Sequence, residues 1–404
     1  RNPITNVRTY GDDPEFVLKC GLAYKRAADE ENVAVSIKHF PGDGCDEVDQ
    51  HILTSVNNLS CEEWDETYGK IYKGLIDDGA LTVMVGHIAQ PAYQKHFNPD
   101  FPDKLVPATL SSELLQGLLR GRLGFNGLIS TDSTCMLGFT VGMKREMAVP
   151  YSIEAGCDMF LFNKDLHEDY QYMMEGYKKG ILSEKRLAAK AAIGLHKKTK
   201  EELVPGKEDL RILRNETYEN WAKECADKSV TLVKNNENIL PLSPAKTKRV
   251  LLEILGNYPS STRVTEHWKA LLEKEGFEVS VYEKEDFSSA PDFSVGTFVS
   301  KYDLVLYVGN MENASNQVTN RYQWYTFWGN GDNCPWFTAE VPVVYISMAN
   351  PYSLVDIPQI QTYINCYSNN DYVIDACVEK LMGRSEFKGK SPVDPFCGKE
   401  YLKY

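Results

Sequence analysis

A short stretch near residue 40 concentrates polar side chains that could do chemistry. Residues 38–51 contain a lysine, two histidines and four carboxylates. The apolar run that precedes them, residues 33–37, is typical of a buried parallel strand, and Pro41, Gly42 and Gly44 stop it. Because α/β barrels carry their chemistry where strands end, we predict an active-site loop at residues 38–51.

Three residues in such positions are candidates for catalysis. Asp49 and His51 are two apart, so in an extended loop they share a face and the carboxylate can orient the imidazole. An oriented histidine transfers protons near neutral pH. Asp132 ends the run 125–131, where it could act as nucleophile, base or ligand, although a helix N-cap fits the spacing equally well. His87 also ends an apolar run and could line the same opening.

The same loop could in principle hold zinc or calcium. The candidate ligands are His39, Asp43, Asp46, Asp49 and His51. Their spacing does not match H-E-x-x-H or the order of ligands in an EF-hand. We therefore predict no metal and no cofactor.

Composition limits the classes of protein that this chain can belong to. With 404 residues, 43% of them hydrophobic, it can form two packed domains. The net charge of −13 argues against a nucleic-acid partner and favours a small neutral substrate. No apolar run reaches the roughly 18 residues of a membrane span, so we expect no membrane partner. Ten scattered cysteines without a C-x-x-C pair indicate reduced thiols and a cytoplasmic location.

The first half of the chain repeats strand and helix patterns. The strand candidates are residues 33–38, 81–86, 128–132 and 158–162. Their spacing predicts βα units and a parallel sheet. An eight-unit barrel typically needs about 250 residues. We therefore expect a partial (β/α)8-type barrel whose N-terminal units are absent from this chain, and a further segment of roughly 100 residues of the same polypeptide before it.

The pattern changes after residue 193. A charged stretch with Pro205 and Gly206 is typical of a linker. The boundaries that we predict are 1–205 for a partial catalytic barrel, 206–215 for a linker and 216–404 for a C-terminal α/β sandwich domain. In this last part, strand candidates such as residues 250–255 and 304–308 alternate with helices such as 263–275.

Together these motifs resemble those of the family 3 glycoside hydrolases. The segment Lys38-His39-Phe40-Pro41-Gly42-x-Gly with a downstream Asp-x-His, and then residues 125–132, are similar to the two catalytic segments of that family. Residues 6–15 resemble its R-S-F-G-x-D-P segment, and residues 228–242 resemble the start of its second domain. The Asp-x-His pair is similar to that of the β-N-acetylhexosaminidase branch, whereas the glucosidase branch takes its acid/base glutamate from the second domain.

The resemblance implies retaining hydrolysis of a terminal β-linked sugar by an exo-acting enzyme. Asp132 would be the nucleophile, His51 the acid/base and Asp49 the residue that orients it. The residues implied to bind the sugar are Arg8, Lys38, His39, His87 and Met136. Position 43 is Asp where this branch often has His, which leaves the preferred sugar open. The family's early βα units supply a carboxylate for the distal hydroxyls, and this chain contains no equivalent.

Several functions fit these residues. The first is hydrolysis that removes terminal N-acetylglucosamine. The alternatives are the activity of a β-N-acetylglucosaminide phosphorylase and that of a β-glucosidase. A non-catalytic sugar-binding protein is a further alternative, but it would not need Asp49, His51 and Asp132 together. The sequence does not specify the natural glycan, the leaving group or the oligomeric state.

Overall fold

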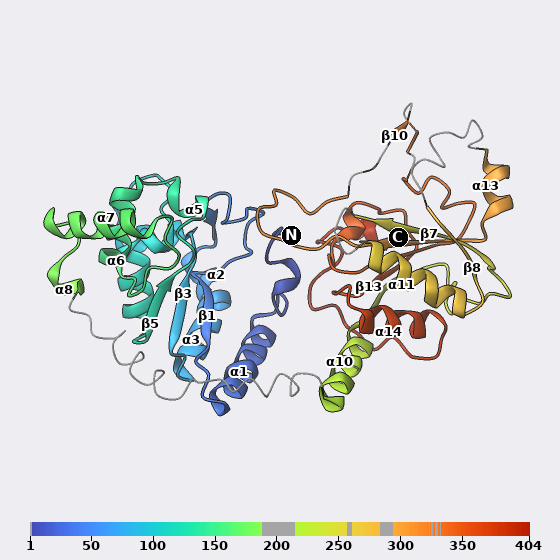
Figure 1. Cartoon of the computed structure of the whole chain (residues 1–404), viewed down its shortest axis with the longest axis horizontal. Coiled ribbons are helices and arrows are strands. Elements are labelled where there is room, and N and C mark those ends of the chain that lie inside the picture. The colour runs from blue at the N-terminus through green and yellow to red at the C-terminus, as the bar shows by residue number, and fades with distance from the viewer. Residues whose placement is uncertain are drawn as a thin grey trace. The chain divides into compact units, whose positions relative to one another are not determined.

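A computed structural model describes residues 2–187, 215–256, 261–282, 294–322, 324, 326–327, 330–331 and 333–404. The chain divides into two compact units (Figure 1). Unit 1 comprises Arg1–Pro205 and Ala314–Thr319, and unit 2 comprises Gly206–Asn313 and Asn320–Tyr404. The predicted linker, residues 206–215, lies outside the described residues except for Asn215.

Unit 1 is built on a three-stranded parallel sheet. Its strands are β1 (Ser36–Phe40), β3 (Thr82–Val85) and β5 (Leu128–Thr131), in the order β1-β3-β5. Ile37 pairs with Val83, which in turn pairs with Ile129. A separate parallel pair joins β2 (Ser55–Val56) to β4 (Ile88–Ala89). Because the three strands of the main sheet are parallel, their carboxyl ends meet at one edge.

Helices accompany this sheet. They are η1 (Asn6–Arg8), α1 (Pro14–Glu30), α2 (Cys61–Trp64), η2 (Asp65–Gly69), α3 (Lys70–Asp77), α4 (Pro91–Phe97), η3 (Ala108–Leu110), η4 (Glu113–Arg122), α5 (Leu137–Thr140), α6 (Arg145–Ala155), α7 (Leu166–Lys178) and α8 (Glu184–Leu187). Two of their starts follow from local chemistry. Asp13 caps α1 ahead of Pro14, and Ser60 forms a reciprocal capping box with Glu63 at α2.

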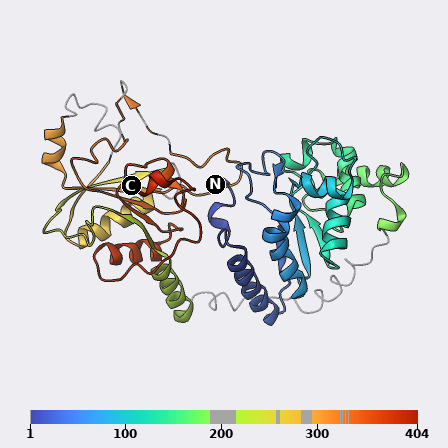
Figure 2. The ribbon, with the colours of Figure 1, turned by 180° about the vertical axis from the view of Figure 1, so that it is seen from behind.

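The core of unit 1 lies between the strands and these helices. It contains Phe40, Trp64, Val83, Leu114 and Ile129, all of them fully buried. Figure 2 shows the strands and helices of this unit from behind, and α1 and α3 pack side by side. The buried face of η4 covers the sheet with four leucines, so the hydrophobic effect holds this layer in place.

The predicted strand at residues 158–162 is wrong in extent. Only one parallel bridge forms there, between Ser130 and Met159. The carboxylate of Asp158 accepts a hydrogen bond from the Ile129 amide at 2.9 Å, where a strand would offer a carbonyl. Phe162 has φ of 58°, which turns the chain away from an extended path. The α/β class of unit 1 is confirmed, but closure into a barrel is not seen among the described residues.

Unit 2 contains a six-stranded sheet in the order β6-β13-β12-β9-β7-β8. The strands are β6 (Thr231–Asn235), β7 (Arg249–Leu255), β8 (Glu278–Val281), β9 (Leu304–Gly309), β12 (Val343–Ser347) and β13 (Thr362–Asn365). All neighbours are parallel except β6 and β13. Strands β9, β12 and β13 are buried along their whole length, as expected for parallel strands that are covered on both faces.

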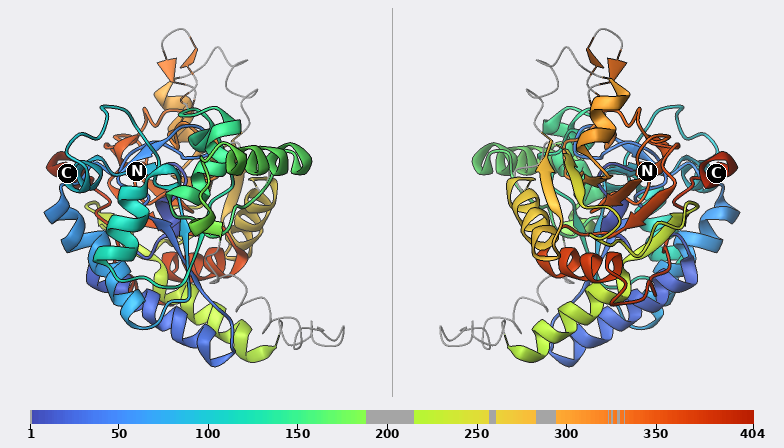
Figure 3. Two further views of the ribbon diagram at one scale, coloured as in Figure 1. Left: turned by 90° about the vertical axis from the view of Figure 1, so that its left-hand side faces the viewer. Right: turned by 90° about the vertical axis from the view of Figure 1, so that its right-hand side faces the viewer.

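Helices and short elements complete unit 2. They are α10 (Glu216–Ser229), α11 (Ser261–Lys274), α13 (Val295–Lys301), β10 (Thr326–Phe327), β11 (Asn330–Gly331), η6 (Ser353–Val355), α14 (Asp371–Leu381) and η7 (Glu400–Lys403). Figure 3 shows α14 beside α11, and both belong to one layer with α10. Separate apolar cores occupy the two faces of the sheet. Within the described part of the chain, no helix combines the length and apolarity that crossing a bilayer requires.

Candidate active site

Asp49 and His51 form a direct pair in the loop after β1. His51 Nδ1 lies 2.7 Å from Asp49 Oδ1, and the backbone amide of His51 donates to the same oxygen at 2.9 Å. A carboxylate only accepts, so Nδ1 carries the hydrogen and Nε2 remains for other partners. Asp49 is 2% exposed, whereas the ring of His51 is partly open to solvent. The carboxylate therefore holds an accessible imidazole in one orientation.

The second oxygen of this carboxylate has a partner that is distant in sequence. The backbone amide of Asn316 donates to Asp49 Oδ2 at 2.7 Å, across a separation of 267 residues. Asn316 belongs to the segment Ala314–Thr319, which is part of unit 1. Its φ of 67° is a left-handed conformation that asparagine tolerates better than most residues. Asp49 is thus held from both sides.

Asp132 follows β5 directly and lies near His39. Asp132 Oδ2 is 3.5 Å from His39 Nε2, and its Oδ1 accepts a hydrogen bond from the Ser133 amide at 2.7 Å. Helix α5 begins only at Leu137, so Asp132 is not a helix N-cap. Its side chain remains partly accessible at the carboxyl end of β5, so the carboxylate can react with a bound molecule.

His39 lies between two carboxylates. Its Nδ1 is 3.6 Å from Asp43 Oδ2 on the side opposite to Asp132, and both separations are too long for hydrogen bonds. Burial lowers the pKa of His39 to about 4, an effect that the charge of Asp132 opposes and those of Lys38, Arg8 and His51 reinforce. His39 is therefore neutral at neutral pH. The charges of Asp132, Lys38, Arg8 and His51 all act on this ring, so these predicted site residues lie in its vicinity.

Asp43 has an unusual environment for a carboxyl group. Burial raises the pKa of Asp43 to about 6, and the nearby charges of Asp46 and Asp49 add to that increase. Hydrogen bonds from the Gly44 amide, at 2.9 Å, and from Gln50 Nε2, at 2.9 Å, favour the ionised form but do not cancel the effect of burial. Asp43 therefore changes charge within the range in which enzymes are assayed.

Gln50 is a residue that sequence reasoning missed. Its side chain is buried, with Nε2 bonded to Asp43 and Oε1 accepting from the His87 amide at 2.8 Å. It therefore links the loop after β1 to the end of β3. Its position between Asp49 and His51 hints at this role, because a loop residue between two site residues points the opposite way.

The loop has further anchors. Ser55 Oγ and the Val56 amide donate to the two oxygens of Asp46, and Trp64 Nε1 donates to the carbonyl of Pro41 at 2.7 Å. Asn2 donates to the carbonyl of Val48 at 2.9 Å. Both oxygens of Asp46 therefore accept hydrogen bonds from within the protein and stabilise the loop. Among the described residues, no group of three or more His, Cys, Asp and Glu side chains is arranged to hold a metal ion.

His87 is placed differently from the other predicted sugar-binding residues. It is fully buried, with Nε2 2.8 Å from the Ser133 carbonyl and Nδ1 3.0 Å from Thr109 Oγ1. Burial lowers the pKa of His87, so the ring is neutral. Because both ring nitrogens are already bonded, this geometry argues for a supporting role beside Asp132 rather than a contact with substrate.

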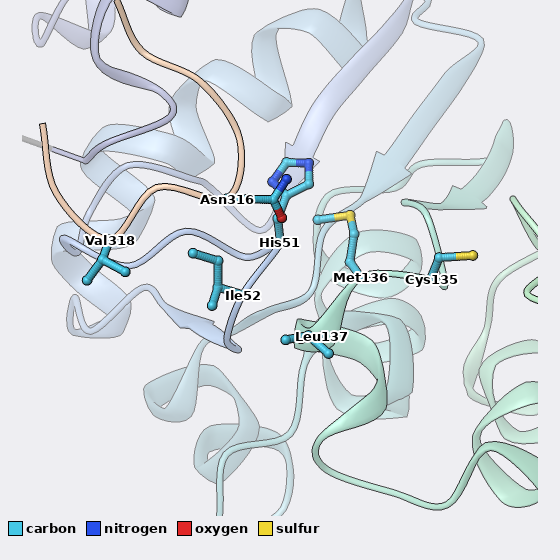
Figure 4. A pocket seen from close by; sticks show the side chains of 7 residues that line it. All are labelled: His51, Ile52, Cys135, Met136, Leu137, Asn316 and Val318. Carbon is cyan, nitrogen blue, oxygen red and sulfur yellow. The ribbon is translucent and has the colours of Figure 1, made fainter. Parts of the chain in front are cut away.

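A cavity of about 530 Å³ opens beside His51. Figure 4 shows the side chains that line it, which are His51, Ile52, Cys135, Met136, Leu137, Asn316 and Val318. Met136, a predicted substrate-binding residue, therefore lines the same cavity as the acid/base candidate. Arg8 and Lys38, the other two candidates, are exposed near His39.

Comparison with known proteins adds independent evidence. Residues 1–193 match the model for the glycosyl hydrolase family 3 N terminal domain. The chain is 40% identical over 416 residues to a beta-N-acetylglucosaminidase/beta-glucosidase of Cellulomonas fimi, covering 98% of this chain and 72% of that protein. It is 29% identical over 264 residues to beta-hexosaminidase A of Pseudoalteromonas piscicida, covering 60% of this chain and 42% of that protein.

Solved structures are similar as well. The structure of the beta-glucoside phosphorylase BglX superposes with a TM-score of 0.91 at 44% identity, covering 99% of this chain and 73% of that one. A family 3 beta-N-acetylglucosaminidase from Paenibacillus sp. shares the fold, with a TM-score of 0.76 at 22% identity, and it covers 98% of this chain and 73% of that one. The predicted family is confirmed by the matched domain and by the relative that aligns along nearly the whole chain. The chain belongs to glycoside hydrolase family 3 and is a glycosidase of that family.

Proposed function

We propose that this protein removes a terminal β-linked sugar, with N-acetylglucosamine preferred, by a retaining mechanism with a covalent glycosyl-enzyme intermediate. The observation that carries the proposal is the buried Asp49 carboxylate 2.7 Å from the ring of His51. A carboxylate that orients an accessible imidazole is the arrangement expected of a general acid/base. Asp132 supplies the second group that retention requires.

In the first step Asp132 attacks the anomeric carbon. The bond from that carbon to the leaving-group oxygen breaks, and His51 Nε2 gives its proton to the departing oxygen. The imidazolium that enters this step is stabilised by the adjacent Asp49 carboxylate. The products of the step are an ester between the sugar and Asp132, a free alcohol and a neutral His51.

In the second step water attacks the same carbon. His51 now takes a proton from the water, the ester bond to Asp132 breaks, and the sugar leaves with its original configuration. One histidine serves both steps because Nδ1 stays bonded to Asp49 while Nε2 loses and regains the proton. The backbone contact from Asn316 keeps Asp49 in the required position throughout.

Sugar recognition is assigned to Arg8, Lys38 and His39. Their positive or polar groups offer N–H donors for hydroxyl or N-acetyl oxygens. His39 is neutral because burial lowers its pKa to about 4, so it can donate from one nitrogen and accept at the other. Its position 3.5 Å from Asp132 supports a contact close to the reacting carbon.

The proposal is tested by comparing two substrates and trapping the intermediate. Steady-state rates would be measured with 4-nitrophenyl N-acetyl-β-glucosaminide and with 4-nitrophenyl β-glucoside. We expect the first to be preferred. An equal preference would refute selectivity for N-acetylglucosamine, and a reversed preference would assign the enzyme to glucosides. Mass spectrometry after incubation with an activated fluorosugar should find the label on Asp132, and a label on any other residue would refute the assigned nucleophile.

A second candidate function is transfer of the sugar to phosphate. The specific observation is the similarity, at 44% identity, to a solved beta-glucoside phosphorylase. A histidine acid/base is neutral after it has given up its proton, so it repels an incoming phosphate less than a carboxylate would. A phosphate oxygen would attack the anomeric carbon in place of water, the bond from that carbon to Asp132 would break, and a sugar 1-phosphate would be released. Phosphorus NMR of reactions with and without inorganic phosphate distinguishes the two functions.

A further inference from the structure

Apolar side chains line the cavity beside His51 although they are open to solvent. Leu137 is 48% exposed and Val318 is 81% exposed. Ile52 and Met136 contribute further apolar surface to the same cavity. Exposed apolar groups that gather in a concave site are typical of surfaces that a ligand covers.

The position of this cavity identifies which part of a substrate would enter it. His51 Nδ1 is bonded to Asp49, so only Nε2 can reach a substrate. In the proposed reaction that nitrogen protonates the leaving-group oxygen, and the leaving group must therefore lie against the exposed side of the His51 ring. The cavity that His51 lines is beside this ring and can bind the leaving group (Figure 4).

The chemistry of the walls indicates the class of leaving group. Of the lining side chains besides His51, four are hydrocarbon or thioether groups, and the polar ones are the thiol of Cys135 and the amide of Asn316. A second sugar would bring several hydroxyls, most of which would lose water without finding a partner here. An aryl or alkyl group would instead gain by covering Leu137 and Val318.

The apolar wall is also tied to the catalytic pair. Val318 and Asn316 come from the segment Ala314–Thr319, and the Asn316 amide donates to Asp49 at 2.7 Å. The same hydrogen bond therefore positions both the acid/base pair and one wall of the cavity. A cavity of about 530 Å³ is within the usual size of small-molecule sites.

We propose that this cavity is the leaving-group site and that it selects an apolar aryl or alkyl aglycone over a second sugar. This inference rests on the proposed function, because it takes His51 as the group that protonates the leaving group. It goes beyond that function by naming the chemical class on the other side of the bond that is cleaved.

The test measures binding and needs no turnover. Isothermal titration would compare S-linked N-acetylglucosaminides, which resist cleavage, that carry either a naphthyl or a methyl group. The variants are Leu137→Ser and Val318→Ser, both at exposed positions where the fold should be little affected. The control is Leu166→Ser, which changes a leucine of α7 that is 65% exposed in the same unit but does not line the cavity.

We expect the wild-type protein to bind the naphthyl compound more tightly than the methyl compound. Leu137→Ser should weaken naphthyl binding about fivefold, the size expected for covering the exposed half of a leucine, and leave methyl binding unchanged. Equal affinity for the two compounds, or a naphthyl preference that survives in both cavity variants, would overturn the proposal. A preference for a disaccharide analogue over the naphthyl compound would do so as well.

Failure of the proposed function would look different. If the naphthyl preference is present and sensitive to Leu137→Ser, but neither O-linked substrate is hydrolysed or phosphorolysed, the cavity assignment stands and the assigned reaction does not. If turnover is normal but the naphthyl preference is absent, the reaction stands and the cavity assignment does not.

Discussion

Replacing Asp49 with asparagine is the most informative perturbation of this site. The change keeps the size of the side chain and removes one acceptor and the negative charge. Asp49 accepts three hydrogen bonds, from His51 Nδ1 at 2.7 Å, the His51 amide at 2.9 Å and the Asn316 amide at 2.7 Å. All three donors point at oxygen atoms, so the NH2 group of asparagine must oppose at least one of them.

The size of the effect follows from this count. If the NH2 group faces Asn316, two donors oppose each other in a buried place. If it faces His51, the ring has to accept at Nδ1 and can no longer be an imidazolium. In either case one buried, charge-assisted hydrogen bond is lost, which costs about 1.5–3 kcal/mol. At about 1.4 kcal/mol per tenfold, the rate should fall about 10- to 150-fold for substrates that need a proton on the leaving group.

The assay is a comparison of leaving groups. kcat/KM would be measured for Asp49→Asn with a methyl glycoside, which leaves only when protonated, and with a 2,4-dinitrophenyl glycoside, which leaves without a proton. We expect a large loss for the first and little loss for the second. Glu47→Gln, an exposed carboxylate in the same loop, is the control and should leave this dependence unchanged.

A double-mutant cycle tests whether Asp49 acts through His51. If Asp49 acts only through the ring that it orients, Asp49→Asn should have almost no further effect in a His51→Ala background. Additive losses in the double variant, or an equal loss for the two leaving groups, would show that Asp49 does not work by orienting His51. The role assigned to the pair would then be wrong.

Three further predictions concern other carboxyl groups. Asp132→Asn should abolish turnover while circular dichroism shows an intact fold, and near-normal rates would exclude Asp132 as nucleophile. Burial raises the pKa of Asp43 to about 6, so below that pH its contacts with Gln50 and Gly44 weaken and kcat/KM should fall. In Asp43→Asn this decrease near pH 6 should disappear, and a decrease that persists at the same pH must come from another group. Burial also holds the pKa of Glu253 in β7 well above its ordinary value, and its Oε1 has no hydrogen-bond partner among the described residues. The folded state therefore keeps a proton that the unfolded chain releases, so the stability that this group contributes at low pH is lost as pH rises above about 4.5. Glu253→Gln should raise the free energy of unfolding at about pH 8 by an amount on the order of 1 kcal/mol, and by less at about pH 5, which thermal unfolding at the two pH values would show as a larger rise in Tm at the higher pH. Glu266→Gln on α11 should change Tm at neither pH.

Much of the site could be predicted from local patterns in the sequence. The D-x-H spacing of Asp49 and His51 needs only an extended loop to bring the two side chains together, and they are in contact. The positions of His87 and Asp132 just beyond apolar runs indicate strand ends, and β3 and β5 end there. The predicted bounds of the first strand are wrong, because β1 runs from Ser36 to Phe40, with Lys38 inside it, and Val33 is 57% exposed. Such predictions succeed because strand formation and i, i+2 geometry depend on neighbouring residues.

Other features depend on contacts that only the folded chain makes. The hydrogen bond from Asn316 to Asp49 joins residues 267 apart, and no local pattern marks that asparagine. The bonds of His87 to Thr109 and Ser133 occupy both nitrogens of a buried ring, which its position after an apolar run did not indicate. The raised pKa of Asp43 arises from burial, which the packing of Tyr68, Gln50 and their neighbours decides. The sequence by itself determined which residues are candidates for the chemistry, because residue type and local spacing are properties of a segment. Only the tertiary structure decided their protonation, their partners and the wall beside His51, because desolvation and long-range contacts arise when distant segments pack together.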